Sequence, residues 1–311
     1  MTLPIIIDAD PGQDDAVAIL MALASPELEV LGITTVAGNV PQPKVTDNAL
    51  RLVELAGRAD VPVHQGAVRP LVRELFTAEY VHGPTGIDGA DLPETTLAPA
   101  DGSAADFIID VCRGAADLSL TLCPLGPLTN IALALRRAPE ITAEVREIVL
   151  MGGAFAESGN VTPAAEFNIF VDPHAARAVF TSGVPITVMP LDVTHKALVM
   201  PHHIERLRAL GTAVGDSVAG MLGFFVRYDL ERYGMGGGPL HDPCVIAYLI
   251  EPALFTGKQV AVSVETDSPL SAGLTLADWW GLTDDEPNAT VMTGVDADAF
   301  MDLVIERIGR L

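Results

Sequence analysis

Four carboxylates lie within eight residues near the N-terminus, in the segment DADPGQDDAVAIL. Asp14 and Asp15 can cap the helix that the following apolar spacing predicts. Asp8 and Asp10 are expected to end a strand and to point the same way, so they repel each other unless a cation or a proton lies between them. The pattern therefore predicts a metal site at the end of this strand.

The ligands available to this ion are oxygens, because the sequence has no cluster of Cys and His residues. Such a set favours a hard cation, Ca²⁺ or Mg²⁺, over Zn²⁺. The first strand alone gives the ion too few ligands. We expect Asp242, in the segment HDP, to supply another, together with a main-chain carbonyl such as that of Leu125. For His241, beside Asp242, a functional role and an ordinary place in a capping region are both open.

Short apolar runs alternate with stretches of helical spacing in the N-terminal part of the chain. The strand-like runs are residues 3–7, 30–38, 118–126, 147–153 and 185–192. This alternation predicts an α/β fold with a mainly parallel, Rossmann-like central sheet flanked by helices. Ligands of such sheets bind at the carboxyl ends of the strands, which is where we expect the active site.

The regular alternation of predicted strands and helices ends in the C-terminal part of the chain. A helical region is expected at 202–232, a mobile Gly-rich loop at 234–239, and further helices from Asp242 and Asp296. Strands are expected at 259–265 and 289–295. Because no low-complexity linker, charge run or internal repeat marks a boundary, we expect a single domain over residues 1–311.

The composition argues against several classes of partner. With 41 acidic and 18 basic residues, the formal net charge is -23, which repels nucleic acid and anionic membrane surfaces. The three cysteines are widely spaced and suit buried thiols in a reducing compartment. With no signal-peptide pattern and no apolar stretch of membrane-spanning length, we expect a cytoplasmic protein.

Two reactions could use a hard cation whose bound water is deprotonated by a carboxylate. A Mg²⁺-dependent phosphohydrolase of the DxD type needs Lys or Arg to hold phosphate, and none stands in the motifs at the strand ends. Hydrolysis at an anomeric carbon passes through an oxocarbenium-like cation, which an acidic site favours.

The aspartate segment closely resembles the N-terminal signature of the inosine-uridine-preferring nucleoside hydrolases. Seven further segments follow in that family's order: TTVAGN (34–39), HGPTGIDG (82–89), PLGPLTNIA (124–132), VLMGG (149–153), GNVTPAAEFNIFVDPHAA (159–176), PLDVTH (190–195) and GGPLHDP (237–243). The resemblance covers nearly the whole chain. It implies the nucleoside hydrolase fold, a ribonucleoside substrate and a homodimer or homotetramer.

The resemblance also implies roles for individual residues. Asp10 resembles a Ca²⁺ ligand that is also the general base for the attacking water, and Asp8 a supporting residue. The remaining Ca²⁺ ligands would be Asp15, Asp242 and the backbone carbonyl of Leu125. The ribose-binding residues would be Asp14, Asn39, Asn160, Glu166 and Asn168.

On the base side, His241 matches the histidine that protonates or orients the leaving base, and His82 matches a second base-side residue. Having both places the chain with the members that prefer inosine and uridine rather than with the purine-specific ones. In the helix or loop before His241, the segment FFVRYDLERYG (224–234) offers Arg227, Tyr228 and Tyr233, of which Tyr233 is the predicted base contact. The implied reaction is calcium-dependent hydrolysis of purine or pyrimidine ribonucleosides to base and ribose, with a pyrimidine-preferring enzyme as the alternative. A non-catalytic nucleoside-binding protein is the alternative from another class.

Overall fold

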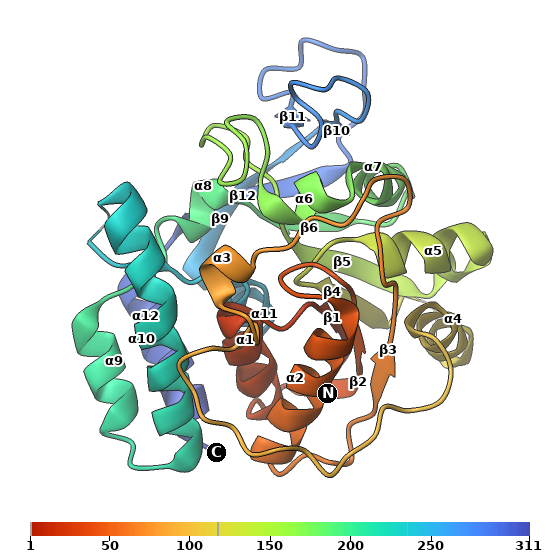
Figure 1. Ribbon diagram of the computed structural model, residues 1–311. Helices are drawn as coiled ribbons and strands as arrows, with labels where there is room; N and C mark the ends of the chain where they lie inside the picture. The colour runs from red at the N-terminus through yellow and green to blue at the C-terminus, as the bar shows by residue number, and fades with distance from the viewer. Residues whose placement is uncertain (1, 117, 235) are drawn as a thin grey trace.

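The computed structural model describes residues 2–116, 118–234 and 236–311, and of Asp229 and Tyr233 it describes only the backbone. A sheet of eight strands runs through this part of the chain (Figure 1). In spatial order its strands are β3 (Val63–Gln65), β2 (Leu28–Thr35), β1 (Leu3–Ala9), β4 (Leu120–Pro124), β5 (Val145–Met151), β6 (Ile186–Met189), β12 (Ala289–Val295) and β9 (Phe255–Val260). Every pair in this sheet is parallel except β9 with β12. The predicted, mainly parallel α/β fold is confirmed.

Strand β1 explains why helices cover both faces of this sheet. Its residues Ile5, Ile6 and Ile7 are fully buried. Because successive side chains of a strand point to opposite faces, Ile5 and Ile7 join one apolar core and Ile6 joins the other. Burial of each such side chain stabilises the fold by about 1.5–3 kcal/mol. A continuous apolar run gains this energy at every residue only when both faces of the sheet are covered.

The two cores are closed by different helices (Figure 1). The core of Ile5 and Ile7 includes residues of α1 (Gln13–Leu23), α2 (Gln42–Leu55), α9 (Pro201–Arg208), α10 (Ala213–Tyr233), α11 (Pro243–Ile250) and α12 (Ala297–Ile308). The core of Ile6 includes residues of α4 (Ala104–Gly114), α5 (Thr129–Arg137) and α7 (Pro173–Phe180). None of the helices within the described ranges is long and apolar enough to cross a membrane.

The C-terminal part differs from the expectation in three places. The strand predicted at 259–265 is divided between β9 and a separate strand, β10 (Val262–Val264), which belongs to another sheet. The helical region predicted at 202–232 is two helices, α9 and α10, because Gly211 adopts a left-handed φ of 68° and Thr212 caps the second helix by accepting a hydrogen bond from the N–H of Gly215. The Gly-rich stretch predicted as a loop contains a short strand, Gly238–Pro239, paired with Leu198–Val199.

Several short elements connect the larger ones. The short helices are α3 (Glu79–His82), α6 (Phe167–Val171), α8 (Leu191–Thr194), η1 (Pro139–Ala143) and η2 (Pro252–Leu254). The short strands are β7 (Leu198–Val199), β8 (Gly238–Pro239), β10 (Val262–Val264) and β11 (Thr275–Ala277), and β10 and β11 form a small hairpin of their own. Of these, α3, α6 and α8 supply or position side chains of the pocket described below.

Candidate active site

A pocket with a cavity volume of about 320 Å³ opens at the carboxyl ends of the parallel strands. Its ionisable and amide lining residues are Asp14, Asn39, His82, Glu157, Asn160, Glu166, Asn168, His195, His241 and Asp242. No Lys or Arg is among the described residues that line it. An uncompensated acidic pocket of this kind attracts cations and disfavours phosphate groups.

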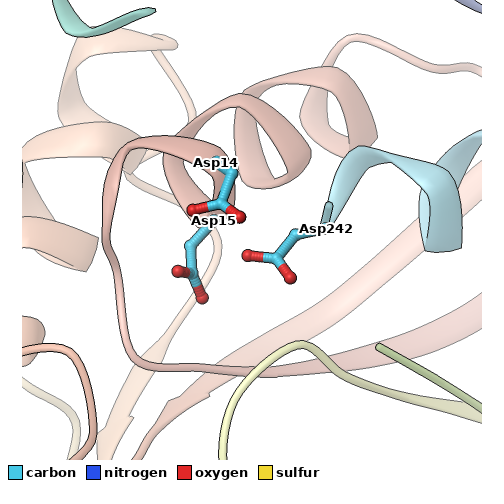
Figure 2. Close-up of side chains that lie close together, drawn as sticks. All are labelled: Asp14, Asp15 and Asp242. Atoms are coloured by element: carbon cyan, nitrogen blue, oxygen red, sulfur yellow. The ribbon is translucent and has the colours of Figure 1, made fainter. Parts of the chain in front are cut away.

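Three buried aspartates point toward one another at this pocket (Figure 2). Asp14 and Asp15 stand in the first turn of α1, and Asp242 immediately precedes α11. One oxygen from each carboxylate lies within 4.8 Å of the other two. The start of α1 fixes this geometry, because the carboxylate of Asp15 accepts hydrogen bonds from the N–H groups of Asp10 (3.1 Å) and Gly12 (3.0 Å).

This three-aspartate cluster is unfavourable as three separate anions. Burial and then the charges of Asp14, Asp15 and Asp10 raise the pKa of Asp242 well above its usual range. Burial also raises the pKa of Asp15, against the hydrogen bond from Gly12. A bound cation would offset this repulsion, and an all-oxygen donor set suits a hard ion. The residues present therefore fit the predicted metal.

Asp10 lies next to the cluster without being one of its three members. Its Oδ2 accepts a 2.7 Å hydrogen bond from the N–H of Asn39, whose side-chain amide donates to the Asp10 carbonyl and to Oδ2 of Asp15, both at 3.1 Å. Gly38 and Gly126 lie against the same carboxylate, since a Cβ at either position would overlap it. Burial and the charge of Asp15 raise the pKa of Asp10 well above its usual range.

The predicted ribose residues surround the ends of β4 and β5. The Asn168 amide donates to the carbonyl oxygens of Leu125 (2.6 Å) and Met151 (3.2 Å). Glu166 caps α6 by accepting hydrogen bonds from backbone N–H groups, and burial nevertheless raises its pKa. Asn160 accepts a hydrogen bond from the N–H of Phe167, at 3.0 Å. The structure thus brings these side chains to one wall of the pocket.

The structure gives Asp14 and the Leu125 carbonyl contacts besides the predicted ones. Asp14 was expected on the ribose, yet its carboxylate belongs to the three-aspartate cluster. The Leu125 carbonyl was expected on the metal, and here it accepts the Asn168 amide. Both contacts are compatible with the predicted roles, because a ribose hydroxyl can contact the metal ion and a ligand of that ion at the same time. The ligand roles of Asp10 and Leu125 stay predictions.

Two histidines, the buried His82 and the half-buried His241, also line the pocket. Nδ1 of His82 lies 2.6 Å from the side-chain oxygen of Gln13, and Nδ1 of His241 lies 2.8 Å from the hydroxyl of Thr194. Phe225 lies beside both rings, stacked on His82 and edge-on to His241. Burial lowers the pKa of each histidine to about 3, so both rings are neutral near pH 7.

The comparison with known families decides the assignment. A family model described as inosine-uridine preferring nucleoside hydrolase matches residues 5–302. The chain belongs to this family. The pyrimidine-specific ribonucleoside hydrolase RihA of Salmonella typhimurium is 50% identical to this nucleoside hydrolase over 309 residues, which cover 99% of each chain.

Solved structures of nucleoside hydrolases share the whole fold. The purine-preferring ribonucleoside hydrolase from Gardnerella vaginalis is 37% identical, with a TM-score of 0.92 over 98% of both chains. A plant nucleoside hydrolase is also 37% identical, with a TM-score of 0.93 over 99% of both chains. This protein is therefore an enzyme that hydrolyses the N-glycosidic bond of ribonucleosides, and the predicted family and reaction type are confirmed.

Sequence reasoning missed one polar corner of this nucleoside hydrolase's pocket. His195 was expected at the surface or in the core, but it lines the pocket, with Nδ1 at 3.8 Å from Glu157 and its ring centroid at 6.0 Å from that of His241. Asp192 builds this corner, because its carboxylate accepts the N–H groups of residues 155–157. The segment PLDVTH was the available signal, since it contains both Asp192 and His195.

The side chains offered by α10 lie in different places. Tyr228 lines the pocket and meets Tyr80 with ring centroids 5.9 Å apart. Arg227 instead stacks over Phe224, at 4.2 Å from the ring. The predicted base contact, Tyr233, is the last residue of α10, and its side chain lies outside the described part of the structure.

Asp8 lies outside the three-aspartate cluster, in a hydrogen-bond network within the sheet. Its Oδ1 accepts hydrogen bonds from Thr34 (2.6 Å) and Asn130 (2.7 Å), which tie β1 to β2 and to the start of α5. Burial raises its pKa to about 7 despite these two bonds. Because β1 ends at Ala9, the alternation of strand side chains does not extend to Asp10, and a shared ligand role of Asp8 and Asp10 stays a prediction.

Proposed function

We propose that this enzyme is a calcium-dependent hydrolase of pyrimidine ribonucleosides that releases free base and ribose. The observation that carries the proposal is one pocket that brings together a buried three-aspartate cluster and two neutral histidines, His82 and His241. The 50% identity to a relative named pyrimidine-specific supports the base preference. We also propose a homodimer or homotetramer on the family resemblance.

Asp15 and Asp242 would hold the calcium ion, with Asp10 and the carbonyl of Leu125 completing the protein ligands and Asp14 beside them. When bound, the ion would lower the pKa of a water molecule and hold the ribose hydroxyls. Asp10 would accept the proton of the attacking water. Burial and the charge of Asp15 raise the pKa of Asp10, which increases its affinity for that proton.

The rest of the pocket would bind ribose and accompany the base as it leaves. Asn39, Asn160, Glu166 and Asn168 would bind the sugar. His241, assisted by His82, would donate a hydrogen bond or a proton to the base, which carries the electron pair of the broken C1′–N bond. The absence of Lys and Arg among the described lining residues suits the cationic sugar of the transition state.

The proposal is tested by turnover of uridine, cytidine, inosine, adenosine and guanosine, with Ca²⁺ and after removal of metal by a chelator. We expect uridine and cytidine to be the best substrates, and chelation to reduce turnover by about 100-fold or more, with recovery on added Ca²⁺. Faster turnover of inosine would overturn the base preference. Tight calcium-dependent nucleoside binding without turnover would favour a binding protein instead.

The ribose model predicts discrimination against 2′-deoxyuridine. Loss of the 2′-hydroxyl leaves buried polar groups of the pocket unpaired, so we expect kcat/KM to fall by about 10³-fold or more relative to uridine. Steady-state kinetics on the two substrates measure the ratio. Comparable values would contradict a site in which the 2′-hydroxyl is bound.

A further inference from the structure

Thr194 contacts His241, the residue proposed to assist the leaving base. It is the last residue of α8 and is fully buried. Its Oγ1 lies 2.8 Å from Nδ1 of His241, although the two residues are 47 positions apart in the chain. A hydroxyl placed in this way can set both the orientation and the proton position of the ring.

An imidazole that carries one proton can hold it on either nitrogen, and the partner of one nitrogen decides the form of the other. When the Thr194 hydroxyl donates to Nδ1, the proton of the ring lies on Nε2. His241 lines the pocket, so Nε2 is then the nitrogen through which the ring can donate to a ligand.

We propose that Thr194 is a positioning residue, whose hydroxyl holds His241 with Nε2–H directed at the leaving base. This inference rests on the proposed function of His241. The four-residue helix α8 would then hold two parts of the pocket. Its Asp192 binds the backbone of residues 155–157, and its Thr194 binds His241.

The first test compares T194V and T194S on two substrates, uridine and p-nitrophenyl riboside. Val matches the shape of Thr and removes only the hydroxyl, whereas Ser keeps it. We expect T194V to lower kcat on uridine by about 10- to 100-fold, as for other residues that orient a functional histidine. On the nitrophenyl substrate, whose leaving group needs no proton, the loss should stay within about 3-fold, and T194S should recover most of the uridine rate.

Thr121 provides a matched control. It is a fully buried threonine on β4 whose hydroxyl has no hydrogen-bond partner within the described residues. T121V should therefore change the two rates by the same small factor. Equal losses of T194V on both substrates, or no loss on either, would overturn the positioning role.

A second readout does not depend on turnover. ¹⁵N NMR of the His241 imidazole in the wild-type enzyme should show the Nε2–H form, and T194V should shift it toward a mixture. A wild-type ring with its proton on Nδ1 would overturn the inference, whatever the kinetics show. If the enzyme lacked nucleoside turnover but kept the Nε2–H form, the proposed function would have failed while the arrangement of Thr194 and His241 held.

Discussion

Replacing Asp242 by Asn is expected to abolish calcium-dependent turnover while making the metal-free protein more stable. The loss of activity should be about 10³-fold or more, because a charged ligand facing the pocket is replaced by a neutral amide. The gain in stability has an electrostatic origin. Asp242 is buried within reach of Asp14, Asp15 and Asp10, and both burial and these charges raise its pKa.

The direction of the effect follows from linkage. A carboxyl group whose pKa is higher in the folded than in the unfolded chain binds its proton more tightly when folded, so it destabilises the fold as pH rises through the folded pKa. Neutral pH lies above the pKa of this carboxyl group in the unfolded chain, so the raised pKa of Asp242 opposes folding of the metal-free enzyme there. Asn cannot ionise, and we expect D242N to raise the free energy of unfolding by about 1–3 kcal/mol without metal.

Thermal unfolding of wild type and D242N at pH 7, with chelator and with Ca²⁺, measures the change in stability. Wild type should gain stability on addition of Ca²⁺, whereas D242N should start higher, by about 3–8 °C, and gain little. D284N, which removes an exposed carboxylate, should behave as wild type. A metal-free D242N that is less stable than wild type, with its calcium response intact, would contradict a role for Asp242 in the ion site.

Much of this arrangement could be predicted because it depends on local patterns. The apolar runs around Ile5, Leu122 and Ile148 are buried on both sheet faces, and such runs specify parallel strands. The aspartates of α1 follow from helix-capping chemistry, and the position of each strand end follows from the sheet itself. Local sequence and tertiary structure agree at these positions.

The features that sequence reasoning missed depend on tertiary contacts. Apart from the segment PLDVTH, nothing local distinguishes His195 from a surface histidine, because it lies in the pocket beside the loop that Asp192 holds. Strand β3 has only three residues and forms through its pairing with β2. Gly38 and Gly126 read as loop glycines in the sequence, and the reason for them is the Asp10 carboxylate that lies against both.

His241→Ala is expected to separate substrates by the quality of their leaving group. Burial, His195 and His82 lower the pKa of His241 to about 3, so near pH 7 the ring is a neutral N–H donor rather than an imidazolium. Such a donor stabilises negative charge as it develops on the base. Uridine needs this help, and we expect its kcat to fall by about 10³-fold in H241A.

With p-nitrophenyl riboside the leaving group is stable as an anion, so H241A should lose only about 10-fold there. Paired kinetics on the two substrates measure the ratio, and H202A, which changes an exposed histidine of α9, is the control. Equal losses on both substrates would remove the leaving-group role and place His241 among the residues that only shape the pocket. If H241A loses kcat selectively on uridine, and T194V shows the same selectivity to a smaller extent, Thr194 and His241 act together through their hydrogen bond in the release of the base.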